Sequence, residues 1–159
     1  MKSGMAKWIL GGWQLNGILT LSKGEPYNVV SGQDRALTGA GSERPNVVGN
    51  PHLDTGRSTN QLLAQYYNPA AYTLPPLGSY GNSGRNTLIA PGVTNLDSSL
   101  FKMIPIREDV KLQFRAEFFN SLNNVNFAAP VTNISTATAG NILSASSPRI
   151  LQFALRLAF

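Results

Sequence analysis

The sequence contains no cysteine, one histidine and few charged residues. Without cysteine, the chain can form no disulfide, thiolate zinc site or cysteine nucleophile. The single histidine, His52, lies in the turn-forming run Gly49–Gly56, where an exposed loop position is expected. The charged fraction of 13% is about half the ~25% that is usual for soluble domains. These absences weigh against metalloenzymes and hydrolases.

The sequence also lacks an apolar run of the ~20 residues that a transmembrane helix needs. Near the N-terminus, Gly11 and Gly12 interrupt a short apolar patch, so no signal peptide is expected there. Asn, Gly and Pro make up about a quarter of the 159 residues, which disfavours a helical bundle. With 42% apolar residues and a net charge of +5, the chain is not expected to be disordered.

The clearest pattern is an alternation of apolar and polar residues that predicts a strand over about 109–120. Because successive side chains of a strand point to opposite faces, the apolar residues share one face and the polar residues share the other. The apolar set is Val110, Leu112, Phe114, Ala116 and Phe118, and the polar set is Lys111, Gln113, Arg115 and Glu117.

Three further alternating runs predict strands. One covers about 149–159, and another covers about 13–30, with a kink at Gly24–Pro26. A weaker strand over about 94–103 is followed by a connection short enough for a hairpin. The segments of about 31–93 and 121–148 lack this alternation and are rich in Gly, Pro, Asn and Ser, so long solvated loops are expected there.

The alternation of long and short connections suggests a membrane barrel. Outer-membrane barrels have short periplasmic turns and long extracellular loops, and a tilted strand of about 11 residues matches their ~25 Å apolar band. In a barrel, the apolar set of the 109–120 strand would face lipid and its polar set would face the lumen. A soluble antiparallel sheet also shows one-sided alternation. Strand length, loop asymmetry and low charge favour the barrel.

Several segments together resemble the C-terminal end of large TonB-dependent outer-membrane receptors. They are Gly12–Tyr27, Tyr80–Asn86, Asn95–Lys102, and Leu112–Asn120 together with Asn126–Phe127. The branch they resemble most is the Oar-like receptors, which carry an N-terminal carboxypeptidase-regulatory-like domain. The resemblance implies an all-β, antiparallel transmembrane barrel in the cell outer membrane, with long extracellular loops and a role in ligand capture and uptake.

The C-terminus is similar to the signal by which outer-membrane barrels are recognised for assembly. In this signal a terminal aromatic residue follows apolar residues at every second position, here Phe153, Leu155, Leu157 and Phe159. The resemblance implies four partners: outer-membrane lipid, the barrel-assembly machinery, the rest of the barrel with its plug, and TonB acting on the full-length parent.

The sequence departs from these receptors in what it lacks. It has no recognisable signal peptide, regulatory-like domain, TonB-contacting segment or plug. Four strands cannot close a barrel, for which about eight is the smallest number. Residues 1–159 are therefore expected to be the C-terminal part of a longer receptor barrel, incomplete and not competent for transport alone.

The alternative function is a small soluble β-sheet protein that binds carbohydrate or another partner. In it, Tyr66, Tyr67, Tyr72 and Tyr80 would stack against sugar rings, unless they pack the long loop onto its own strands. We expect no enzyme, cofactor or metal site, because Glu108 and Asp109 are adjacent and splay apart. Nucleic acid is not expected either, since the basic residues are scattered despite a pI of about 9.8.

Overall fold

The computed structural model describes residues 8–41, 43–54 and 56–159. They divide into two compact units. The sheet unit contains the described residues of 1–22, 93–126 and 147–159, and the loop unit contains those of 23–92 and 127–146. Part of the N-terminal segment in which no signal peptide is expected, residues 1–7, lies outside the described residues.

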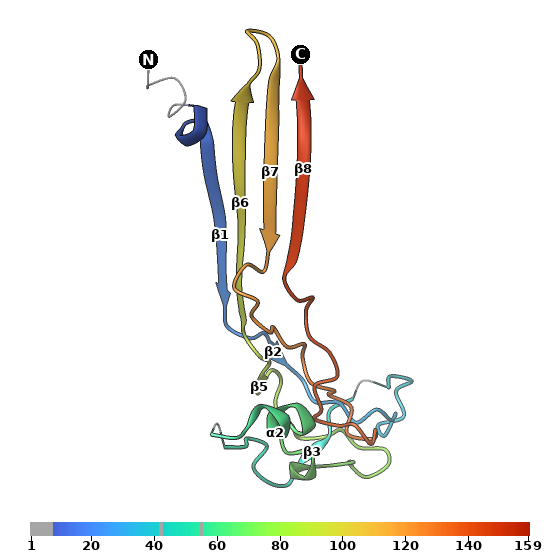
Figure 1. Cartoon of the computed structure of the whole chain (residues 1–159). Helices are drawn as coiled ribbons and strands as arrows, with labels where there is room; N and C mark the ends of the chain where they lie inside the picture. Colours follow the sequence, from blue (N-terminus) through green and yellow to red (C-terminus); the bar gives the residue numbers. More distant parts are fainter. Residues whose placement is uncertain (1–7, 42, 55) are drawn as a thin grey trace. The chain divides into compact units, whose positions relative to one another are not determined.

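In the sheet unit, four long strands form one antiparallel sheet (Figure 1). They are β1 (Trp13–Ser22), β6 (Val93–Pro105), β7 (Lys111–Phe119) and β8 (Ile150–Ala158), in the order β1-β6-β7-β8. Within the described residues the sheet is open, with β1 and β8 at its edges. This confirms the predicted all-β class and an incomplete antiparallel barrel.

The ends of β7 show why its length differs from the predicted 109–120. Val110 belongs to the tight β6–β7 turn, where its carbonyl accepts hydrogen bonds from the backbone N–H of Ile106 (2.9 Å) and Arg107 (3.1 Å). At the other end, Asn120 has a φ of 51°, a left-handed conformation that ends the strand. Val110 is therefore a turn residue rather than a strand residue with a defined face.

The predicted strand over 13–30 is wrong beyond Ser22. The kink is present, but Pro26–Tyr27 (β2) pairs with Leu88–Ile89 (β5) in a separate two-stranded sheet. Gly24 approaches the carbonyl oxygen of Ala90 so closely that no Cβ would fit. This close approach and the missing N–H of Pro26 prevent β1 from continuing in its own sheet.

The loop unit is folded, and the expectation of solvated loops over 31–93 and 121–148 is wrong for much of it. Backbone hydrogen bonds of 3.0 Å join Val30 to Thr132 and Ile134, so the two connections meet. The other elements are β3 (Asn46–Val47) paired with β4 (Tyr72–Thr73), α2 (Thr59–Ala64) and the 3-10 helix η1 (Pro69–Ala71).

Buried side chains from segments far apart in the sequence give the loop unit its own core. The core consists of Val29, Tyr67, Ala71, Tyr72 and Leu88. The capping box at the start of α2, in which Ser58 and Gln61 exchange hydrogen bonds, defines where that short helix begins. No helix in the described ranges is long and apolar enough to cross a membrane.

Candidate membrane-facing sheet and loop pocket

The strand register extends the alternation of β7 across the whole sheet. Leu112 lies opposite Ile104 of β6 and Leu157 of β8, and directly opposed residues share a face. The apolar face of the sheet comprises Trp13, Leu15, Leu19 and Leu21 of β1, Leu96, Leu100 and Ile104 of β6, Leu112, Phe114, Ala116 and Phe118 of β7, and Leu151, Phe153, Leu155 and Leu157 of β8.

Large side chains of this apolar face are exposed. Leu15 is 76% exposed, Leu155 70% and Phe153 64%. A soluble sheet packs such a face onto a core, and contiguous exposed apolar surface marks contact with protein or membrane. The face is therefore suited to lipid.

The opposite face carries the polar set of β7. Arg115 and Glu117 form an ion pair of 2.7 Å, and the guanidinium of Arg115 lies 4.8 Å from the centre of the Phe101 ring. On the same face, Asn16 Nδ2 donates to Ser99 Oγ at 3.3 Å. Lys111, Gln113, Arg115 and Glu117 thus share one face, while Leu112, Phe114 and Phe118 share the other. That these faces contact the lumen and lipid respectively stays a prediction.

Lys102 is a charged residue on the apolar face, and sequence reasoning missed it. It lies opposite Trp13 and Phe114 and is only 6% exposed. Its ammonium donates hydrogen bonds to the carbonyls of Trp8 and Ile9, both at 2.9 Å, and to that of Gly11. It also lies 4.8 Å from the centre of the Trp13 ring. These bonds hold the residues before β1 against the sheet.

The candidate assembly signal lies along an edge strand. Phe153, Leu155 and Leu157 project from β8 on the apolar face, and Phe159 follows directly after that strand. Among the described residues, β8 pairs only with β7. The free edge of β8 is thus available for pairing with another strand.

The four tyrosines considered as sugar platforms have different environments. Tyr67 is 1% exposed and Tyr72 6%, so both belong to the loop-unit core and neither is a platform. The hydroxyl of Tyr67 donates to the carbonyl of Val131 at 3.1 Å. Burial, with a smaller contribution from Tyr72, raises the pKa of Tyr67 to about 12, so this donor stays protonated. Tyr80 is exposed, and Tyr66 is half-buried beside a pocket.

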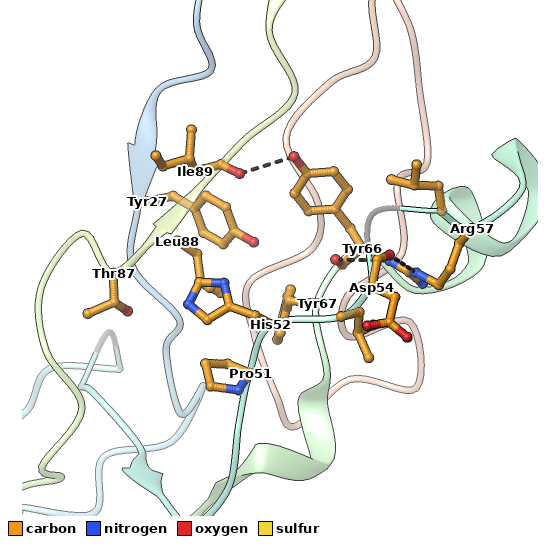
Figure 2. A pocket seen from close by; sticks show the side chains of 12 residues that line it. Tyr27, Pro51, His52, Asp54, Arg57, Tyr66, Tyr67, Thr87, Leu88 and Ile89 are labelled. Carbon is orange, nitrogen blue, oxygen red and sulfur yellow. Dashed lines mark hydrogen bonds between the residues drawn. The ribbon is translucent and has the colours of Figure 1, made fainter.

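That pocket, of about 360 Å³, lies within the loop unit (Figure 2). Tyr27, Leu88 and Ile89 line it from β2 and β5, while Tyr66, residues 51–54 and Arg57 line it from elsewhere in the chain. Burial raises the pKa of Tyr66 and, most strongly, that of Tyr27, so both rings are neutral at physiological pH. His52, expected in an exposed loop, is exposed and lines this pocket.

Glu108 and Asp109 lie exposed in the β6–β7 turn of the sheet unit. In the part of the chain that the structure describes, no group of three or more His, Asp or Glu residues could hold a metal ion.

Comparison with known proteins assigns the chain to a protein family. The family model described as "outer membrane beta barrel domain" matches residues 1–152. No curated protein and no solved structure matches the chain. The matched range includes β1, β6 and β7 in full, so it favours the membrane interpretation of the alternating strands over a soluble sheet. The chain belongs to the outer membrane beta barrel domain family, and its location is the outer membrane.

Proposed function

We propose that the chain forms part of the barrel of a TonB-dependent receptor of the Oar-like branch, which captures a ligand and takes it up. The supporting observation is the sheet with one exposed apolar face and an opposite face that carries the polar set of β7. Lipid would cover the apolar face, and the receptor's plug would contact the polar face around Arg115 and Glu117. A charged side chain on the lipid side costs about 2–4 kcal/mol at mid-depth, which explains why the charges of β7 share the other face.

The open sheet supports a role as a segment of a larger barrel. Unpaired backbone groups are not tolerated in lipid, so the edges of β1 and β8 need partner strands. In this proposal the rest of the receptor supplies those strands, and the assembly machinery recognises the C-terminal signal. The role is one of binding and transport, without catalysis, cofactor or nucleic acid.

An immunoblot of native cells tests the proposed parent protein. An antibody raised against the peptide of residues 74–92 should detect a band in the outer-membrane fraction, well above the 17.1 kDa of this chain. A water-soluble band of 17.1 kDa would contradict the proposal. A 17.1 kDa band confined to the outer membrane would support a barrel but contradict the receptor assignment.

A crosslinking experiment tests the TonB assignment separately. Formaldehyde treatment of intact cells, followed by capture with the same antibody, should yield a product that also contains TonB. A strain without TonB provides the control. Captured protein that never carries TonB, although it is present in the outer membrane, would contradict this part of the proposal.

A further inference from the structure

The pocket of the loop unit combines an apolar lining with ordered walls. Its volume of about 360 Å³ lies near the lower end of the ~300–1,000 Å³ that is typical of small-molecule sites. The aromatic walls are Tyr27, Tyr66 and Tyr67 (Figure 2), and the rest of the lining combines aliphatic side chains with a few polar ones. A ligand that fits must therefore be small and must present an apolar face.

Hydrogen bonds from Tyr66 and Arg57 hold the walls of the pocket in place. The hydroxyl of Tyr66 donates to the carbonyl of Ile89 at 3.1 Å, which ties its ring to β5. The guanidinium of Arg57 donates to the carbonyls of Asp54 (3.0 Å), Gln61 (3.2 Å) and Gln65. Arg57 therefore positions the segment that carries Asp54, and its N–H groups are largely occupied. A preorganised wall reduces the ordering cost of binding.

The buried hydroxyl of Tyr27 and two exposed polar side chains of the lining have no such partner among the described residues. Within the described residues, no hydrogen bond or ion pair is formed by the carboxylate of Asp54 or the imidazole of His52. Both residues are exposed and belong to the pocket lining. A carboxylate accepts hydrogen bonds only, so it suits a ligand that is rich in hydroxyl donors.

These features select among ligand classes. A purely apolar ligand would leave Asp54 and His52 unused, and an anionic ligand would meet the Asp54 carboxylate while Arg57 is already engaged. A sugar ring has an apolar face that packs on an aromatic ring and an edge of hydroxyls. We propose that the pocket binds the end of a neutral oligosaccharide, with the Tyr66 ring against a sugar face and Asp54 and His52 bonded to hydroxyls.

This proposal rests on the proposed function for the location of the loop unit at the cell surface. Its test, however, requires neither an intact membrane nor TonB. Isothermal titration of the detergent-purified protein would use malto-, cello-, xylo- and chitohexaose as neutral probes and a polygalacturonate hexamer as the anionic comparison. A failure to bind these probes would leave the immunoblot and TonB results unaffected, so the two proposals can fail separately.

We expect at least one neutral hexaose to bind in preference to the anionic one. Asp54→Asn should weaken that binding by up to about tenfold, because the ligand hydroxyl then donates to a neutral amide oxygen in place of a charged carboxylate. Tyr66→Ala should abolish it, whereas Tyr80→Ala, an exposed tyrosine outside the lining, should leave it unchanged.

Three outcomes would overturn the proposal. They are no binding of any neutral hexaose, preference for the anionic hexamer, or unchanged affinity in Asp54→Asn. Asp54 is exposed and makes no side-chain hydrogen bond within the described residues, so the Asp54→Asn variant should fold. The test therefore stays decisive even if the Tyr66→Ala variant fails to fold.

Discussion

The sheet unit and the loop unit place their large apolar side chains in opposite ways. In the sheet, Leu15 is 76% and Leu155 70% exposed, whereas in the loop unit Tyr67 and Leu88 are 1% and 4% exposed. Among the described residues, the loop unit buries a core of apolar groups, as water requires, although Leu37 and Leu77 stay exposed. The sheet unit buries none of its described large apolar side chains, as lipid permits. We therefore expect the two units of this chain to be adapted to two different solvents.

Hydrogen bonds to uncharged groups stabilise a buried charged side chain in each of the two units. Lys102 in the sheet donates to main-chain carbonyls. Glu43 in the loop unit, 8% exposed, accepts from the N–H of Ala36 and the hydroxyl of Thr38, both at 2.8 Å. Neither side chain forms an ion pair with another described residue. Backbone and hydroxyl groups replace lost solvation in both places.

The largest expected effect is at the loop-unit core. Tyr67→Ala should lower the free energy of unfolding of the loop unit by about 3–5 kcal/mol, because it leaves a cavity among packed side chains. Hydrogen exchange of amides in that unit measures the change. Tyr80→Ala is the control and should change it by no more than about 0.5 kcal/mol. Equal effects of the two variants would contradict a packed core around Tyr67.

The next effect tests the apolar face of the sheet. Leu155→Arg should destabilise the membrane-inserted protein by about 2–4 kcal/mol and reduce its amount in the outer-membrane fraction, because the new charge would face lipid. Gln152→Arg, on the other face of β8 and opposite Glu117, is the matched control. If both variants reach the outer membrane equally well, the two faces do not contact different media.

A smaller effect is expected from Lys102→Met. The variant leaves the carbonyls of Trp8, Ile9 and Gly11 without their donor, at a cost of about 1–3 kcal/mol. Trp8 and Trp13 are the two tryptophans of the chain, so fluorescence reports on this site.

We expect a changed emission maximum and faster proteolysis before β1 in Lys102→Met. Lys111→Met, on the polar face of β7, is the matched control and should show neither change. Emission and proteolysis that are the same in both lysine variants would contradict the role of Lys102 in holding residues 8–11.

The smallest effect depends on pH. The N–H groups of Thr38 (2.9 Å) and Gly39 (2.8 Å) donate to the Asp34 carboxylate and hold its pKa below the ordinary 3.8. The charged form thus stabilises this loop fully above about pH 4, and its contribution is lost as the pH falls through the lowered pKa. Protection of the Thr38 and Gly39 amides, measured against the intrinsic exchange rate at each pH, should fall in acid, and Asp34→Asn should remove that dependence. An unchanged acid profile in Asp34→Asn would exclude the carboxylate as its cause.

The long strands were predictable because their pattern is local. A period of two identifies β7 and β8 from a few consecutive residues. The same alternation places Lys102 on the apolar face, two residues from Leu100 and Ile104. Its carbonyl partners, however, come into reach only through the pairing of β1 with β6. No local pattern encodes that contact.

The loop unit was less predictable because its structure depends on distant contacts. Its core joins Val29, Tyr67 and Leu88, and its paired segments are only two residues long. Such short ladders carry no periodicity, so Gly- and Pro-rich sequence predicted loops instead. The pocket follows from the same packing: Tyr66 and His52 were visible as residue types, but their position around one cavity was not.

The most direct test of the two-solvent account is spin-label accessibility along β7. The 159 residues contain no cysteine, so each cysteine introduced at 111–118 carries the one nitroxide once any cysteine elsewhere in the parent protein has been replaced. In native outer-membrane vesicles, oxygen accessibility should peak at positions 112, 114 and 118, and accessibility to a water-soluble nickel chelate should peak at 111, 113, 115 and 117. An alternation of period two in this phase is the predicted result. Absent alternation, or the opposite phase, would contradict the account.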